Sequence, residues 1–325
     1  MTRTTRVLVT GAGGPAGVAV IRSLLRRGDV EVVAADMDRW ASGLYLVPAG
    51  RRRLVPAGRA DEFVDVVRQI CTDERIDVLF STVDVELPKV AAARDLLADA
   101  GTLLAAPSLR TLDLCLDKLA LAHACAGALR VPRTELLGTP QALAGWDYPV
   151  IVKPRRGAGS RGVRVVASER ELDTVHDDED LLVQELLPGQ EYSVDVLADS
   201  TGHVVAAVPR ARLRVDSGVA VAGVTLLDDE LVEAASAVAR AVGLTSVANV
   251  QLKRDADGVP ALLEVNPRFP GAMPLTIAAG VDMPSLLLDD VLGRGVPRHV
   301  AHTEIANVRY LEDVFLGVDE VLPAP

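Results

Sequence analysis

The chain has 325 residues, 49% of them hydrophobic, which is enough to bury a sizeable core in two or three domains. Its formal net charge of −11 at pH 7 argues against a general nucleic-acid binder, because phosphate contacts need clustered lysine and arginine. The three cysteines form no CxxC pair and no apolar run reaches membrane-spanning length, so we expect a cytoplasmic protein without a zinc ribbon, a disulfide scaffold or a membrane segment.

The first 113 residues alternate between strand and helix patterns. Four short apolar runs are typical of buried strands: residues 6–10, 30–36, 77–81 and 102–105. Helical patterns separate them: residues 18–27, 61–72 and 86–100. This alternation predicts a parallel sheet covered by helices, in a Rossmann-like domain.

A glycine-rich turn follows the first predicted strand. Gly11, Gly13 and Ala16 have the spacing of a dinucleotide fingerprint, and Asp36 ends the second strand, where such sites hold a ribose. The same turn can also serve close packing of strand and helix, or bind an anion at the helix N-terminus. An NAD(P)-dependent oxidoreductase is therefore an alternative, disfavoured because neither a Tyr-x-x-x-Lys pair nor a catalytic histidine follows the turn.

Two acidic residues, Asp84 and Glu86, follow the predicted strand at residues 77–81. Open α/β sheets bind ligands at the carboxyl ends of their strands, so these side chains are candidates for holding a substrate amino group. Glu86 can equally favour the N-terminus of the helix that begins there.

Lysine is rare in this chain, with only four among 34 basic residues, and two of the four lie next to suggestive elements. Lys118 lies on a helical pattern at residues 113–127. Lys153 ends an apolar strand, where a charged side chain is costly to bury unless it meets an anion.

The loop after Lys153 is rich in glycine. Gly157, Gly159 and Gly162 let the backbone approach phosphates closely, and Ser160 can add a hydroxyl donor. The loop lacks the GK[ST] end of a Walker loop. It is expected to close over bound phosphates, and a flexible hairpin tip is the alternative.

Long strand patterns dominate the chain from about residue 191. Arg210, Arg212 and Arg214 alternate along one of them and are expected to share one face. That face is either solvated or able to hold a substrate carboxylate through Arg210 and Arg212. Further elements are predicted at residues 228–242 (a helix), from residue 285 (a helix) and at residues 304–310 (an edge strand).

A β-hairpin is predicted from two apolar runs, residues 247–253 and 259–265, which flank an Asp- and Gly-rich turn. Gln251 and Glu264 can face each other across this hairpin, and Asn266 shares a face with Glu264. Three oxygen ligands then converge, a set that suits Mg²⁺ with substrate phosphates and water in its remaining positions. Arg268 follows just beyond the strand.

Together, Lys118, Lys153, the glycine loop and the Gln251 … Glu264-x-Asn266-Pro-Arg268 combination resemble the ATP-grasp superfamily, in particular its carbamoyl-phosphate-synthase-like members. The resemblance runs from about residue 114 to about residue 292. It implies an α/β protein (α+β in the grasp core), in which a Rossmann-like domain at residues 1–113 precedes a two-lobed ATP-grasp fold. The small lobe with the lid loop would cover residues 114–187, and the large lobe with the metal hairpin residues 188–325.

The resemblance also implies how ATP is held. Lys118 would contact a phosphate, Lys153 the α-phosphate and adenine, and the lid loop with Gly159 and Ser160 would close over them. Backbone groups of a hinge would read the adenine edge, and an acidic residue after the hinge glycine would hold the ribose. The hinge residues are Gln184, Glu185 and Leu187, and the ribose candidate is Glu191.

The metal and catalytic roles follow from the same resemblance. Gln251, Glu264 and Asn266 would hold one or two Mg²⁺, and Arg268 would stabilise the transferring phosphoryl group and a later oxyanion. Gln251 is neutral where many relatives carry glutamate, and carbamoyl-phosphate synthases also use glutamine here.

The implied activity is an ATP- and Mg²⁺-dependent ligase that joins a carboxylate to an amine through an acyl phosphate and releases ADP and phosphate. One ATP-grasp core supports one phosphorylation type at a time, so we expect a stand-alone ligase and not a carbamoyl-phosphate synthase, which has two cores. The intact lysines and hairpin residues disfavour a non-catalytic ATP-binding regulator, the remaining alternative. The expected partners are small-molecule carboxylate and amine substrates, with a homodimer left open.

Overall fold

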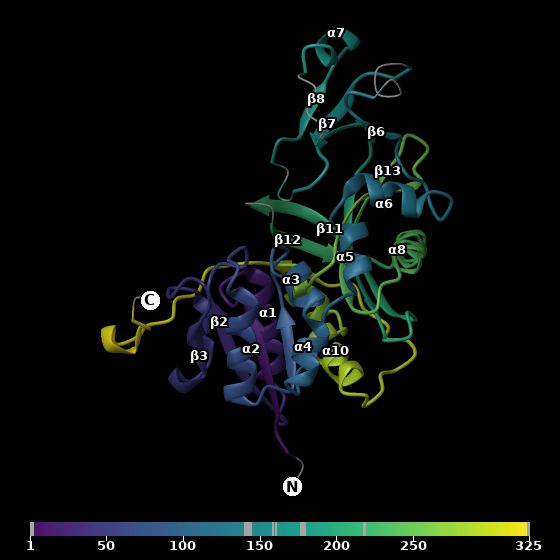
Figure 1. The fold of residues 1–325 in the computed structure, drawn as a ribbon. Helices are drawn as coiled ribbons and strands as arrows, with labels where there is room; N and C mark the ends of the chain where they lie inside the picture. Colours follow the sequence, from purple (N-terminus) through teal and green to yellow (C-terminus); the bar gives the residue numbers. More distant parts are fainter. Residues whose placement is uncertain are drawn as a thin grey trace.

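The computed structural model describes residues 3–139, 145–157, 159, 161–175, 180–216 and 219–323. Its strands form three sheets: a parallel sheet of five strands, a large sheet of six strands and a small sheet of four strands. Figure 1 shows the small sheet standing apart from the parallel sheet, with the large sheet between them.

The parallel sheet is formed by the N-terminal third of the chain, as its alternating pattern predicts. Its strand order is β3 (Arg52–Leu54), β2 (Val30–Asp36), β1 (Thr5–Thr10), β4 (Val78–Ser81) and β5 (Leu103–Leu104). The helices that accompany it are α1 (Pro15–Leu24), α2 (Phe63–Glu74), α3 (Leu87–Ala92) and α4 (Arg94–Asp99). Apolar side chains of the central strands are completely buried, which is typical of a parallel sheet covered on both faces.

Two helices are interrupted where the sequence predicts continuous ones. The pattern at residues 86–100 forms α3 and α4, and Arg94 at the start of α4 donates to the carbonyls of Leu104, Ala106 and Pro107. The pattern at residues 113–127 is divided in the same way into α5 (Leu109–Cys115) and α6 (Lys118–Cys125).

The large sheet is antiparallel, and its order is β14 (Pro260–Asn266), β13 (Val247–Arg254), β10 (Glu191–Ala198), β11 (Val204–Asp216), β12 (Val219–Thr225) and β15 (Ala306–Val308). Helix α8 (Asp229–Val242) packs on one face and buries apolar side chains against β10 and β13. Strand β15 lies at the edge, which confirms the predicted edge strand at residues 304–310.

The small sheet has its own small core. It consists of β6 (Thr134–Leu136), β9 (Leu181–Glu185), β7 (Val150–Pro154) and β8 (Arg164–Val166), with the short helix α7 (Glu169–Leu172) beside it. Its apolar cluster contains no residue of the other two sheets. The small sheet is therefore joined to the rest of the described chain through connecting segments and polar contacts.

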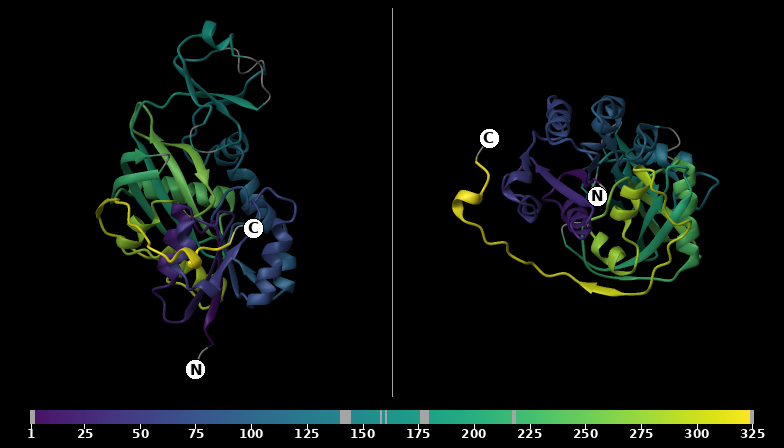
Figure 2. Two further views of the ribbon diagram at one scale, coloured as in Figure 1. Left: turned by 90° about the vertical axis from the view of Figure 1, so that its left-hand side faces the viewer. Right: turned by 90° about the horizontal axis from the view of Figure 1, so that it is seen from below.

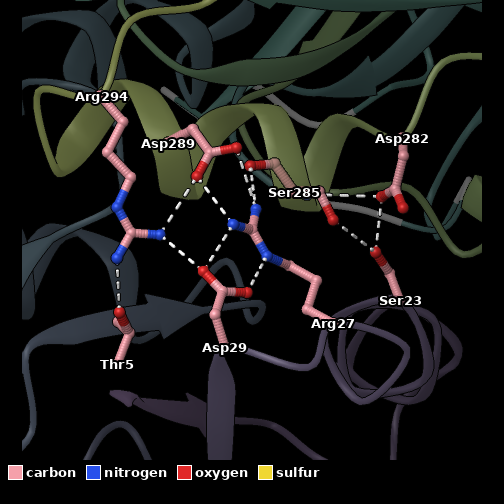
Figure 3. A network of polar contacts seen from close by, with 8 residues as sticks. All are labelled: Thr5, Ser23, Arg27, Asp29, Asp282, Ser285, Asp289 and Arg294. Carbon is pink, nitrogen blue, oxygen red and sulfur yellow. Dashed lines mark hydrogen bonds and ion pairs between the residues drawn. The ribbon is translucent and has the colours of Figure 1, made fainter. Parts of the chain in front are cut away.

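Helices α9 (Met273–Ala278) and α10 (Met283–Val291) connect the large sheet to the parallel sheet, and one apolar core runs through both. A polar network reinforces this contact (Figure 3). The Arg27 guanidinium bonds to Asp29 and to Asp289 of α10, each at 2.9 Å, and Arg294 donates to Asp29 at 2.8 Å. These contacts attach the segment between α1 and β2 to α10 and the residues that follow it.

The C-terminal segment runs in extended form from β15 toward the parallel sheet (Figure 2). Its end is held by Arg52, whose guanidinium donates to the Glu320 carbonyl at 2.9 Å. Within the described residues, no helix is both long enough and apolar enough to cross a membrane.

Candidate active site

The β13–β14 hairpin forms with the predicted register. Gln251 lies opposite Glu264 and Asn249 opposite Asn266, and the register shifts directly after the Gln251–Glu264 pair. Val265 is buried in the core beneath α8, whereas Glu264 and Asn266 are half-buried on the other face. The predicted alternation across this strand end is confirmed.

The polar side chains at this hairpin end have few partners in the protein. The Asn266 amide lies 3.5 Å from Glu264 Oε1, and within the described chain the Gln251 side chain makes no hydrogen bond. No group of three His, Cys, Asp or Glu residues in the described chain could hold a metal, and this set contains a single carboxylate. Such a donor set suits Mg²⁺ that arrives with a polyphosphate and keeps water and phosphate oxygens as ligands.

Two lysines from other elements interact electrostatically with Glu264. Lys153, at the end of β7, is 7% exposed, and its Nζ donates to Gln184 Oε1 at 2.7 Å. Burial and the neighbouring Lys118 lower the pKa of Lys153 to about 8, while Glu264 acts in the opposite direction. Burial also lowers the pKa of Lys118, which Glu264 again partly offsets. The residues Lys118, Lys153 and Glu264 thus belong to one electrostatic cluster.

The glycine loop begins beside Lys118, whose Nζ donates to the Gly157 carbonyl at 2.9 Å. Gly157 and Gly159 have positive φ angles of 131° and 72°, conformations that disfavour side chains. A Cβ atom at either position would meet nothing within 4 Å, so backbone conformation and not crowding requires glycine here. Ser160, a predicted donor of this loop, lies outside the described residues.

Some polar groups of the hinge residues already make hydrogen bonds within the protein, and others have no partner among the described residues. The Gln184 amide donates to Thr134 Oγ1 at 2.8 Å, and the Glu185 carboxylate bonds to Arg130 at 2.5 Å. Because the Glu185 N–H also bonds to the Arg133 carbonyl at 2.9 Å, it is not free for a ligand. Leu187 is 2% exposed, and in the described structure its backbone N–H and C=O bond to no other residue.

The predicted ribose ligand Glu191 forms an ion pair with Arg212. Both residues are partly exposed and lie on neighbouring strands, β10 and β11. A ribose that binds to Glu191 would therefore meet a carboxylate that already forms an ion pair with Arg212.

The expectation that Arg210, Arg212 and Arg214 share one face holds for Arg210 and Arg212 and is wrong for Arg214. The register between β11 and β12 runs without a break from Arg210 to Arg212, then shifts after Arg212 and again after Arg214. Arg210 is 2% exposed and bonds to the fully buried Asp195 through two contacts, at 3.0 and 2.7 Å. Asn249 and Thr276 donate to the same carboxylate, so Arg210 belongs to a buried network.

The two predicted acids at the carboxyl edge of the parallel sheet differ. Asp84 accepts a hydrogen bond from Arg268 Nε at 2.8 Å, which joins the parallel sheet to the end of the β13–β14 hairpin. Glu86 is 6% exposed and accepts from Thr10 and Ser81. Burial raises the pKa of Glu86, against the effect of these two hydroxyls. Asp84 therefore lies in the candidate site, and Glu86 lies behind it.

The glycine turn after β1 is occupied by its own chain. The Gly13 N–H donates to Asp36 at 2.8 Å, so the predicted ribose ligand is already held by the turn. A Cβ on Gly17 would lie 2.2 Å from the Gly11 carbonyl oxygen, and one on Gly43 would lie 2.0 Å from the Ala12 oxygen. These contacts support the packing interpretation of the motif.

Two residues of this region were absent from the sequence-based predictions. Arg309 follows β15 and donates to the Gly271 carbonyl at 2.6 Å. Burial and the nearby Arg210 lower the pKa of Arg309. No carboxylate in the described structure forms an ion pair with it. Asp117 directly precedes α6 and accepts from the backbone N–H groups of Leu119 and Ala120. An acidic residue directly before a helical pattern is a capping signal. Because the sequence pattern predicts one continuous helix at residues 113–127, Asp117 falls inside that helix and its capping role is not predicted.

Comparison with known proteins agrees with this architecture. Residues 177–314 match a family model described as ATP-grasp in the biosynthetic pathway with Ter operon, and residues 7–105 match a PylC-like N-terminal domain. The arginine-specific carbamoyl phosphate synthase large chain of Bacillus subtilis is 26% identical over 278 residues, which cover 78% of this chain and 25% of the relative. A D-alanine–D-alanine ligase of Pediococcus pentosaceus is 28% identical over 171 residues, or 46% of this chain and 48% of the relative.

Solved structures show the same fold at low sequence identity. Biotin carboxylase of Campylobacter jejuni has a TM-score of 0.73 at 18% identity, and the match covers 90% of this chain and 72% of the biotin carboxylase chain. An L-amino acid ligase of Bacillus licheniformis has a TM-score of 0.70 at 20% identity, with 90% and 75% covered.

Residues 177–314 thus match an ATP-grasp family model, and over about 90% of its length the chain has the fold of these two solved structures. In sequence the chain resembles the carbamoyl-phosphate-synthase large chain, although it spans only a quarter of that relative and about half of the ligase.

Proposed function

We propose that this protein is an ATP- and Mg²⁺-dependent ligase that joins a carboxylate to an amine through an acyl phosphate and releases ADP and phosphate. The observation that carries the proposal is the convergence of Lys118, Lys153 and Glu264 from three different elements. Two desolvated cations beside a half-buried carboxylate favour a polyphosphate with a bound cation, because each charge then gains an opposite partner.

The nucleotide would lie between the small and the large sheet. Lys118 and Lys153 would bind its phosphates, and the loop with Gly157 and Gly159 would cover them. The backbone N–H and C=O of Leu187 bond to no other described residue, which supports a role in reading the adenine edge, since an N–H and a C=O at a strand end match the ring without a special side chain. Glu191 would contact the ribose.

Gln251, Glu264 and Asn266 would hold Mg²⁺, which neutralises charge on the transferring phosphoryl group when it is bound. The half-buried position of these residues and the scarcity of protein partners support this role.

The chemistry needs no covalent protein nucleophile. A substrate carboxylate oxygen attacks the γ-phosphorus as the bond to the ADP oxygen breaks, which gives an acyl phosphate. The amine then attacks the acyl carbon, loses a proton and expels phosphate. Arg268, oriented by Asp84, would stabilise charge on the transferred group and on the tetrahedral intermediate. Arg309 would add a second cation for the substrate carboxylate.

The amine would bind near the carboxyl edge of the parallel sheet. Asp84 would supply negative charge there, partly balanced by its partner Arg268, whereas Glu86 is buried behind it with a raised pKa. The acceptor substrates are therefore expected to be small molecules with a cationic amino group.

The test is the release of ADP from Mg²⁺ and ATP with pooled amino acids, other amines and small carboxylates. ADP formation that requires one carboxylate and one amine, and that stops with EDTA, would support the ligase. AMP as the product would mean adenylation and would refute the acyl-phosphate route. If no pool stimulates turnover while MgATP still binds in calorimetry, a non-catalytic ATP-binding protein is the better description.

A further inference from the structure

Asp117 occupies the junction between the helix that carries Lys118 and the glycine loop. It is 3% exposed and lies at the break between α5 and α6. Its Oδ1 accepts from the backbone N–H groups of Leu119 and Ala120, each at 3.1 Å, so it caps the N-terminus of α6.

The same carboxylate binds two arginines at the start of the glycine loop. Arg155 Nε lies 2.8 Å from both Asp117 oxygens, and its Nη2 lies 2.7 Å from Oδ2. Arg156 Nη2 lies 3.0 Å from Oδ2. Although burial acts in the opposite direction, these partners and the helix N–H groups hold the pKa of Asp117 below its usual value.

Two further bonds close the connection. The Lys118 N–H donates to the Arg155 carbonyl at 3.1 Å, and Lys118 Nζ donates to the Gly157 carbonyl at 2.9 Å. Both segments that are expected to meet phosphates, the Lys118 turn and the glycine loop, are therefore attached to one another around one buried carboxylate.

The two attached segments belong to different parts of the fold. Leu121 and Cys125 of α6 are buried in the core that α8 forms with the large sheet. The glycine loop instead follows β7 of the small sheet, whose core is separate. The Asp117 contacts thus connect the small sheet to the large sheet at the entrance of the candidate nucleotide site.

We propose that Asp117, through Arg155, is a positioning residue that holds Lys118 and the base of the glycine loop in register for the phosphates of ATP. The proposal rests on the proposed function for the identity of the ligand. Bidentate contacts between arginine and carboxylate fix orientation as well as distance, which would hold Lys118 and the Gly157 backbone in one arrangement for the phosphates.

The test separates this role from helix capping. Asp117→Asn keeps an acceptor for the N–H groups of α6 and nearly the same volume, but removes the charge that binds Arg155. We expect the Kd for MgATP to rise on the order of tenfold, as is common when a partner that orients a ligand-binding group is lost. Tryptic cleavage after Arg155 and Arg156 without nucleotide should become faster.

Two controls use similar residues elsewhere. Asp228 also caps a helix, α8, and pairs with Arg254 at 2.8 Å, but α8 lies away from the glycine loop, so Asp228→Asn should leave the Kd for MgATP unchanged. Arg156 has a 69% exposed side chain and one contact, whereas Arg155 is 30% exposed and has several. Arg155→Gln should therefore reproduce the Asp117→Asn effect, and Arg156→Gln should change the Kd less than threefold or so.

The outcomes are distinct. If the wild-type protein does not bind MgATP, the proposed function fails. If the wild-type protein binds MgATP and Asp117→Asn binds it equally well with unchanged cleavage, the positioning role is refuted. A lower melting temperature for Asp117→Asn than for Asp228→Asn, with the same Kd, would likewise overturn the proposal in favour of a purely structural contact.

Discussion

The glycine turn after β1 and the end of the β13–β14 hairpin both have sequences typical of a ligand site, yet their polar groups are used differently. In the turn, Asp36 accepts from Gly13, and Gly17 packs directly on the Gly11 carbonyl. At the hairpin end, Gln251 makes no hydrogen bond to a described residue, and the one hydrogen bond of the Glu264 side chain within the described chain is a weak one to Asn266.

This difference teaches how to separate packing motifs from binding motifs. A polar group that the protein already satisfies gives up that bond when it takes a ligand, whereas a half-buried group without partners gains from one. Substitutions of Gln251, Glu264 or Asn266 should therefore reduce activity and leave stability intact, and substitutions of Gly17 or the buried Arg210 should do the reverse.

The largest effect is expected for Glu264→Gln, which removes the one carboxylate of the proposed metal set and little volume. ADP formation should fall on the order of 10³-fold, the scale of losing one group that stabilises transition-state charge. The melting temperature should stay at the wild-type value. Asp257→Asn in the turn of the same hairpin is the control, and full turnover by Glu264→Gln would refute the metal assignment.

Arg210→Gln tests a satisfied group in the same sheet. It leaves Asp195 buried without its arginine, which should lower the free energy of unfolding by about 3 kcal/mol, as measured in urea. Arg214→Gln, an exposed arginine on the same strand, should change it little. A stable Arg210→Gln protein with impaired turnover would instead restore Arg210 as a substrate ligand.

Gly17→Ala tests the glycine turn. The new methyl group would lie 2.2 Å from the Gly11 oxygen and 2.9 Å from Ala12 Cα, and because both are backbone atoms, α1 must move. A stability loss of about 2 kcal/mol is expected, with unchanged Kd for MgATP. Gly28→Ala is the control, since a Cβ there meets nothing within 4 Å. Nucleotide binding that fails in Gly17→Ala alone would mean that the turn itself holds a ligand.

The smallest effect concerns pH. Burial lowers the pKa of Lys153 to about 8, and a bound phosphate would restore the charged form, so binding takes up a proton above that pH. The affinity for MgATP should fall about tenfold between pH 7 and pH 9, and calorimetry in buffers of different ionisation enthalpy should detect the proton. Lys153→Arg should flatten this dependence, because arginine stays charged; a flat wild-type profile would contradict the assignment.

The lowered pKa of Lys153 also affects how stability depends on pH, and it does so in the opposite direction from its effect on MgATP affinity. Between about pH 8 and the ordinary lysine pKa of 10.5, the unfolded chain binds a proton that the folded chain has released. Unfolding then takes up a proton, so the contribution of Lys153 to stability rises with pH through this window.

The sequence by itself determined those features that depend on local periodicity. The alternation at residues 247–266 gave the hairpin register and brought Glu264 opposite Gln251, because strand side chains alternate with a period of two. The strand and helix alternation of the first third gave the parallel sheet in the same way. The roles of the individual site residues remain predictions for the experiments above.

Only the tertiary structure decided which polar groups are free and which are satisfied. Arg268 meets Asp84 across 184 residues, and Arg210 pairs with the buried Asp195, whereas its sequence pattern left open a solvated face or a substrate-binding one. Asp117 joins the Lys118 turn to a loop 38 residues away. Such contacts depend on how sheets and helices pack against each other, and local patterns contain no information about packing between segments that are distant in the chain.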